Sequence, residues 1–477
     1  MALLMAAYHF VLLITLYLLK PLRDSLFLSG RGPEELPFVF VLTTIAVVPV
    51  AVLHTRFARE LHVGRLMDGV SLFLAVSLLG VYWLLGAEGS WSAYVLYAWV
   101  SIYGLLITSQ YWLFANTVFS ASQAKRVFTA LSVGAILGAV AGGEVTGLLV
   151  DEVGLPPRSL LWVTTGLLVG SVGLARYIRI RHRDRGGSVE TPADDRADDV
   201  PGAGEIIFGS RHIQLIVGVI ALTVITTTFI DFQFKTVAAR AFESETALTT
   251  FMGRFYGRVS IVALIVQFVL APRLMKIVGI GGALSILPLG LALGTVGMIV
   301  VPGLVAGILL RGTDQSLKHS IDKTGRELLY VPLSLEKKKR VKGFVDLFVD
   351  QGAQGVGGVL LLGLTMWMDL SVQALALVTM GMLAAWGYLA YRARHSYVDQ
   401  FRRKLREQEG ETTREATSTP DADAQDALSA DLDELLKSLC SHNETEALRA
   451  LTELETDEDT TVPVDALRCL LDHPSEA

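Results

Sequence analysis

Ionisable side chains stand inside long apolar stretches of this sequence, where only a membrane would surround them. Such a side chain costs about 3 kcal/mol at the centre of a spanning helix on insertion scales, so it usually faces a water-filled cavity on the path of a substrate or an ion. The first, seventh, eighth and eleventh apolar stretches contain such residues. These four places supply the candidates for binding and coupling.

The first stretch contains two cations beside one carboxylate. Lys20 and Arg23 are candidates for contact with an anion, and Asp24 is their local counter-ion. Pro21 would kink the helix and leave one backbone carbonyl unpaired. The alternative is a helix that ends at Leu19, with all three charges at the membrane interface.

The seventh stretch places an acid and a base one helical turn apart. Asp231 and Lys235 are four residues apart and therefore share a helix face, where they can form an ion pair. A substrate or a coupling ion could open that pair. A simple salt bridge at the membrane interface is the alternative.

The eighth stretch begins with two arginines one turn apart, Arg254 and Arg258, with Gly253 and Gly257 on the adjacent line. Two guanidinium groups on one face suit bidentate capture of phosphate or carboxylate oxygens. Alternatively, the Arg254 side chain extends to the membrane interface.

The eleventh stretch carries a polar stripe of Asp346, Asp350 and Gln354 at positions i, i+4 and i+8. Carboxylates in a spanning helix suit coupling to protons or cations, because their protonation can report which side of the membrane is open. For Asp346 alone, the alternative is that it neutralises the basic loop before it.

The apolar stretches predict the architecture. A hydrocarbon core about 30 Å thick needs ~20 mostly apolar residues per helix, and 52% of this chain is hydrophobic. We therefore expect an all-α polytopic membrane protein with twelve transmembrane helices. The expected spans are 3–28, 37–54, 67–87, 92–114, 128–150, 159–180, 211–233, 250–271, 278–299, 302–321, 343–367 and 371–393. In the fifth span, Gly134, Gly138 and Gly142 predict a close contact between helices.

The polar stretches divide the chain into parts. Two six-helix halves, 1–180 and 211–395, are separated by a cytoplasmic linker at 181–210, which is the layout of a major-facilitator-like transporter. Another twelve-helix topology is the alternative. A basic collar and disordered linker follow at 396–427, and a small α-helical cytoplasmic module, which resembles a repeat, at 428–477.

Charge and composition narrow the function. The positive side chains of the short loops predict that both termini lie in the cytoplasm. The net charge of −6 comes with an acidic tail, so we expect no nucleic-acid partner. Cys440 and Cys469 are expected to be reduced thiols. We find no pattern for a catalytic pair, a metal or a cofactor, so we expect no enzyme, and a monomer in the lipid bilayer.

Several motifs together resemble the ATP/ADP translocase family, the nucleotide antiporters of plastids and intracellular bacteria with relatives in free-living bacteria. The resemblance implies a major-facilitator-like fold, a bacterial inner membrane and exchange of adenine nucleotides without ATP hydrolysis. The matching motifs are Leu22-Arg23-Asp24, Tyr111-Trp112-Leu113-Phe114-Ala115-Asn116 with Ala124-Lys125-Arg126, Asp231 to Lys235 with Phe251-Met252-Gly253, and Arg326 to Leu333 with Val341-Lys342-Gly343 and Asp346.

The sequence departs from the pattern of the family's exchangers at three positions. Leu26 and Gln354 stand where the resemblance implies a lysine, and Val100 stands near an expected acidic position. The helix-seven acidic position is kept as Asp231. The loss of two cations removes part of what would hold a triphosphate.

We therefore consider three hypotheses. The first is an ATP/ADP antiporter with a basic central cavity that works by alternating access; Asp231, Asp346 and Asp350 would reset the empty carrier. Its phosphate-binding residues would be Lys20, Arg23, Lys235, Arg254 and Arg258. The second is a transporter of a smaller organic anion, coupled to protons through Asp346 and Asp350. The third is a membrane sensor or scaffold that acts through its tail.

Overall fold

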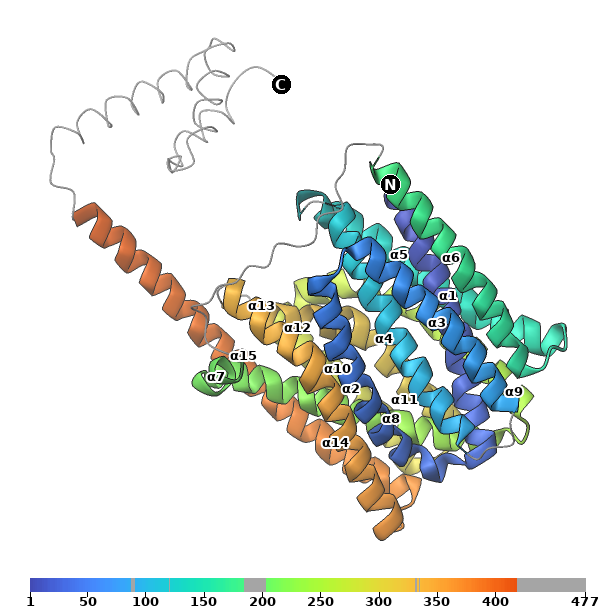
Figure 1. Cartoon of the computed structure of the whole chain (residues 1–477). Helices are drawn as coiled ribbons and strands as arrows, with labels where there is room; N and C mark the ends of the chain where they lie inside the picture. The colour runs from blue at the N-terminus through green and yellow to red at the C-terminus, as the bar shows by residue number, and fades with distance from the viewer. Residues whose placement is uncertain (87–90, 120, 184–202, 331–332, 334, 418–477) are drawn as a thin grey trace, which may run out of the picture. The chain divides into compact units, whose positions relative to one another are not determined.

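The protein is almost entirely helical in the residues that the computed structural model describes, which are 1–86, 91–119, 121–183, 203–330, 333 and 335–417 (Figure 1). The first half contains α1 Ala2–Arg31, η1 Pro33–Glu35, α2 Leu36–Glu60, α3 Val63–Gly86, α4 Ser92–Val118, α5 Ala121–Gly147, η2 Leu148–Glu152, η3 Pro157–Ser159 and α6 Leu160–Arg183. The second half contains α7 Ala203–Gly209, α8 Arg211–Ala241, α9 Glu245–Ile265, η4 Val266–Leu270, α10 Ala271–Val300, α11 Leu304–Leu317, η5 Lys318–Asp322, α12 Lys323–Leu329, α13 Leu335–Phe344, η6 Val345–Val349, α14 Asp350–Leu362, η7 Gly363–Trp367 and α15 Val372–Thr417.

The all-α membrane architecture is confirmed. Within the described residues, nine helices are long and apolar enough to cross a bilayer. Of the remaining predicted spans, 278–299 lies within α10, whose apolar part Leu284–Val300 is shorter than the nine, while 302–321 and 343–367 pass into π-helical segments. The total of twelve spans stays a prediction.

Helix α1 lies against α5 over much of its length. It continues through Pro21 to Arg31, so the alternative in which the helix ends at Leu19 is wrong. A Cβ on Gly134 would come within 2.5 Å of the Ala6 carbonyl oxygen, and one on Gly142 within 2.8 Å of the Ile14 carbonyl oxygen. Only glycine allows backbones to approach so closely, which confirms the helix contact predicted for this ridge.

The first and second halves of the chain meet at two further glycine contacts. On one side, a Cβ on Gly143 of α5 would lie 2.5 Å from the carbonyl oxygen of Gly253 and 2.5 Å from the amide nitrogen of Gly257, both on α9. On the other side, a Cβ on Gly358 of α14 would lie 3.1 Å from the Pro37 carbonyl oxygen of α2. Helix α1 approaches α8 between these contacts, and this is where the charged residues collect.

The ends of the polar stretches are helical. Residues 181–183 of the predicted linker complete α6, and Ala203–Gly209 form α7. The chain divides into a unit of Met1–Gln400 and a second unit of Phe401–Ala477. Of the second unit, the structure describes only the last part of α15. The predicted tail module at 428–477, with both cysteines, lies outside the described residues.

Candidate functional site

Six charged side chains form one buried group, which we call the ion network. They come from three helices that are distant in sequence, and three are nearly inaccessible: Asp24 is 0% exposed, and Lys235 and Asp314 are each 1% exposed. The ion network consists of Arg23 and Asp24 of α1, Asp231 and Lys235 of α8, and Arg311 and Asp314 of α11.

Lys235 joins the two halves of the molecule. Its Nζ lies 2.8 Å from Oδ2 of Asp231 on its own helix and 3.3 Å from Oδ1 of Asp24 on α1. The same Asp24 oxygen lies 2.8 Å from Nη2 of Arg23. The predicted pairing of Asp231 with Lys235 is therefore present, and Asp24 is the counter-ion of Arg23.

Arg311 extends the ion network to α11. Its Nη2 lies 2.8 Å from Oδ1 of Asp231, and its Nη1 pairs with Asp314 one turn further along the helix. Three cations therefore face three carboxylates. A buried charge without a partner is costly, so this balance allows the group to exist inside the protein.

Two tyrosines complete the surroundings of the ion network. The Tyr97 hydroxyl of α4 accepts a hydrogen bond of 2.7 Å from Lys235 Nζ, and the Arg23 guanidinium lies 4.2 Å from the centre of the Tyr97 ring. On the other side, the Tyr256 hydroxyl of α9 donates to Oδ2 of Asp24 at 2.7 Å. Helices α4 and α9 thus hold the charged side chains in place.

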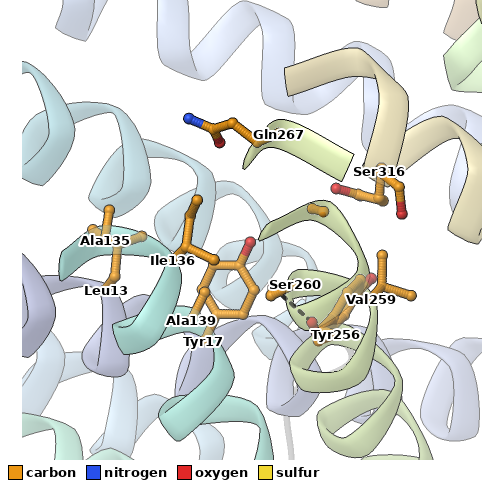
Figure 2. A pocket seen from close by; sticks show the side chains of 12 residues that line it. Leu13, Tyr17, Ala135, Ile136, Ala139, Tyr256, Val259, Ser260, Gln267 and Ser316 are labelled. Atoms are coloured by element: carbon orange, nitrogen blue, oxygen red, sulfur yellow. Dashed lines mark hydrogen bonds between the residues drawn. The ribbon is translucent and has the colours of Figure 1, made fainter. Parts of the chain in front are cut away.

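A cavity of about 230 Å³ borders the ion network (Figure 2). Tyr256 belongs to both, because it lines the cavity and donates to Asp24. The cavity lining is mostly apolar, with a few polar groups. It consists of Leu13 and Tyr17 of α1, Ala135, Ile136 and Ala139 of α5, Tyr256, Val259, Ser260 and Ala263 of α9, Gln267 of η4, and Gln315 and Ser316 of α11.

The structure brings together four of the predicted site residues, Arg23, Asp24, Asp231 and Lys235. Lys20 lies apart from them, with its Nζ 4.6 Å from the centre of the Tyr17 ring. Since Tyr17 lines the cavity, Lys20 lies close to the cavity and outside the ion network.

Arg254 and Arg258 do not join the ion network. Arg254 pairs with Asp151 at 2.9 Å, and Arg258 lies 3.7 Å from Glu144 with 69% of its side chain exposed. The helix period explains their position. A residue two places from Tyr256 points about 200° away from it around the helix, so both arginines face away from Asp24.

The polar stripe of the eleventh predicted span is also separate. In the described residues, Oδ1 of Asp350 is buried without a hydrogen-bond partner. Gln354 is partly buried. The Asp346 side chain lies outside the part that the structure describes.

Sequence reasoning missed Arg311, Asp314, Tyr97 and Tyr256. The first two stand inside the predicted span 302–321, so the rule that flagged the other intramembrane charges also identifies them. The tyrosines carry no such signal, because tyrosine is common in spanning helices and at their ends.

Known proteins match both the sequence and the fold. The family model of the TLC ATP/ADP transporter matches residues 61–159. The ADP,ATP carrier protein 4 of Rickettsia felis is 19% identical, covering 71% of this chain and 79% of that protein.

Among solved structures, the nucleoside transporter NupG superposes with a TM-score of 0.57 at 13% identity, covering 84% of this chain and 98% of that one. An inward-facing bacterial homologue of ferroportin gives 0.55 at 13% identity, over 81% and 98%. The fold is that of major-facilitator transporters. The relatives are carriers, which confirms the prediction of a transporter rather than an enzyme. The chain is therefore a multi-pass membrane transporter that is similar to the ATP/ADP carrier family, as its motifs predicted.

Proposed function

We propose that the protein exchanges adenine nucleotides across a bacterial inner membrane by alternating access, with the ion network as the phosphate site. One observation carries this proposal: Arg23, Lys235 and Arg311 converge at the junction of the two halves, each held by a carboxylate. Phosphate oxygens are the ligands that such cations favour, and arginine binds them in bidentate fashion.

The pairing within the ion network supports exchange rather than one-way transport. Lys235 bridges Asp24 on one half and Asp231 on the other, so separating the halves breaks a buried pair. Breaking such a pair without a replacement costs about 3–5 kcal/mol. A bound nucleotide offers phosphate oxygens in place of Asp24. The loaded carrier therefore changes state at lower cost than the empty one.

The positions along the helices support an inward-facing state. With the N-terminus in the cytoplasm, as the loop charges predict, Asp24 lies in the outer part of α1 and the cavity lies further toward the inside. Both glycine contacts between the halves, at Gly143 and Gly358, also fall in the outer part. Contacts on the outside and a cavity on the inside favour a carrier closed to the exterior.

Arg311 compensates for the cations that the sequence lacks relative to the family pattern. Leu26 and Gln354 lack the charge that the resemblance implies, and Arg311 supplies a third cation to the ion network. We assign Arg311 to the phosphate site in place of Arg254 and Arg258, whose partners lie elsewhere.

Exchange in proteoliposomes tests this proposal. Labelled ATP should accumulate in vesicles preloaded with ADP and not in empty vesicles. Lys235→Gln should abolish this uptake, whereas Lys276→Gln, which removes an exposed lysine of α10, should preserve it. Folding of each variant is checked by its thermal unfolding. Equal uptake into empty and preloaded vesicles would contradict exchange.

A proton-coupled carrier of a smaller organic anion is the second candidate. The observation in its favour is Asp350, whose buried Oδ1 has no hydrogen-bond partner among the described residues, since an ionisable side chain within a spanning helix is a candidate for proton coupling. This candidate predicts anion uptake driven by a pH gradient into vesicles without internal nucleotide. Loss of that uptake in Asp350→Asn would support it.

A further inference from the structure

We infer that the cavity beside the ion network holds the base of the nucleotide, and that Gln267 and Gln315 determine which base is accepted. This inference rests on the proposed nucleotide exchange and extends it to the other end of the substrate. It assigns a binding role to residues that neither the sequence motifs nor the ion network single out.

The chemistry of the cavity excludes phosphate and suits a flat aromatic ring. None of the described residues that line it is charged, and α5 contributes only Ala135, Ile136 and Ala139. Tyr17 and Tyr256 face the cavity with their rings 6.4 Å apart, centre to centre. Figure 2 shows both rings at the cavity wall. Aromatic side chains bind nucleobases by stacking, because every base presents a π-face.

The two glutamines provide donors and acceptors for the edge of a base. Gln267 comes from η4 and Gln315 from α11, so they approach from two elements. Neither amide forms a hydrogen bond with another residue in the part of the chain that the structure describes. A carboxamide carries both a donor and an acceptor. Glutamine can therefore pair with the adjacent ring nitrogen and amino group of adenine.

The size of the cavity fits one part of a nucleotide. Its volume is about 230 Å³, which is below the roughly 300 Å³ at which pockets for whole drug-sized ligands begin. A base fits such a space, and the sugar and phosphates must lie outside it. The cations next to the cavity are Lys20 and those of the ion network.

Three helices connect the two ends of this site. On α1, Asp24, Lys20, Tyr17 and Leu13 follow one helix face from the ion network to the cavity, at the spacing of successive turns. On α9 the sequence runs from Tyr256 to Ser260 and on into η4 at Gln267, and on α11 from Arg311 to Gln315.

Arg311 and Gln315 are four residues apart, which corresponds to about 6 Å along a helix axis. The site thus has a charged end and an aromatic, amide-bearing end a short distance apart. A nucleotide has the same two ends, and this match sets its orientation with the phosphates toward Arg311 and the base toward Gln267.

Competition for labelled ATP on the purified full-length protein in nanodiscs tests the inference. Pyrophosphate probes the ion network, adenosine probes the cavity, and GTP probes the choice of base. In the unmodified protein, both pyrophosphate and adenosine should displace ATP, and GTP should displace it at least tenfold less well than unlabelled ATP.

The double variant Gln267→Ala with Gln315→Ala should lose roughly tenfold or more in affinity for ATP and for adenosine, and ATP and GTP should become nearly equivalent. Its affinity for pyrophosphate should stay unchanged, which shows that the variant is folded. Gln373→Ala, at an exposed position near the start of α15, is the matched control.

Two results would overturn the inference, and they are distinguishable. If ATP and pyrophosphate bind but the glutamine variant keeps the ATP affinity and the preference over GTP, the cavity does not hold the base, while nucleotide transport stands. If neither ATP nor pyrophosphate binds to the folded protein, the proposed function itself fails, and the base site fails with it.

Discussion

Oppositely charged side chains pair across the two halves in two regions with very different surroundings. In the ion network, Lys235 and Asp24 are almost completely buried. On the α9 face toward α5, Arg258 and Glu144 pair with 69% and 44% of their side chains exposed. Each pair consists of one basic and one acidic side chain, and each joins one half to the other. The difference in burial decides what each pair can do.

Burial makes the ion network sensitive to its partners. Breaking an exposed ion pair costs only about 0–1 kcal/mol, because water solvates both charges once they separate. A buried charge that loses its partner costs several times more, about 3–5 kcal/mol. Only the buried ion network therefore requires a substrate to replace a lost carboxylate. Binding of substrate there changes the equilibrium between the two conformations of the carrier, whereas at the exposed pair it does not.

The largest expected effect comes from Arg311→Gln. This change leaves Asp314, which is 1% exposed, without its cation and removes one of two cations from Asp231. We expect a loss of about 3–5 kcal/mol in unfolding free energy and loss of exchange. Thermal unfolding in detergent and ATP uptake against internal ADP measure the two effects separately.

A second substitution separates charge balance from phosphate binding. Adding Asp314→Asn to Arg311→Gln removes the unpaired carboxylate, so stability should recover while exchange remains absent. If the double variant recovered both stability and exchange, Arg311 would be a structural residue without a role at the phosphate site.

An intermediate effect is expected from Gly143→Val. A Cβ there would lie 2.5 Å from the Gly253 carbonyl oxygen, so α5 and α9 must separate, at a cost of about 1–3 kcal/mol for overpacking. The ion network lies beside this contact and should open with it. Distances between spin labels at the outer ends of α5 and α9 should increase.

Gly166→Val provides the control, because a Cβ on Gly166 of α6 meets nothing within 4 Å. That variant should keep the distances of the unmodified protein and its rate of exchange. If Gly143→Val also left the distances and the exchange unchanged, the glycine contact would play no part in closing the outer side.

Apolar length and helix period predicted most of the fold. The runs of apolar residues located the nine spans found in the described residues, and the glycine ridge of α5 predicted its contact with α1, because both depend on local sequence alone. Asp231 and Lys235 were paired correctly for the same reason, since four residues on a helix fix a shared face.

Contacts between helices that are distant along the chain could not be predicted from the sequence. Arg254 and Arg258 have the spacing of a binding pair, but packing of Gly253 and Gly257 against α5 turns both arginines toward carboxylates of that helix and the segment after it. Spacing gives a shared face and does not say what that face meets. The pairing of Lys235 with Asp24, more than two hundred positions away, depends on how the halves dock.

The smallest effect should come from Arg258→Gln, and it decides whether spacing or burial identifies the site. Arg258 is mostly exposed, and its partner Glu144 lies 3.7 Å away, so the change should alter stability by less than about 1 kcal/mol. Exchange should stay within about twofold of the unmodified protein, measured in the same vesicles as Arg311→Gln. A loss as deep as that of Arg311→Gln would place Arg258 on the substrate path. It would also mean that the arginine pair of the eighth span binds phosphate in another state of the carrier, after α5 and α9 have separated.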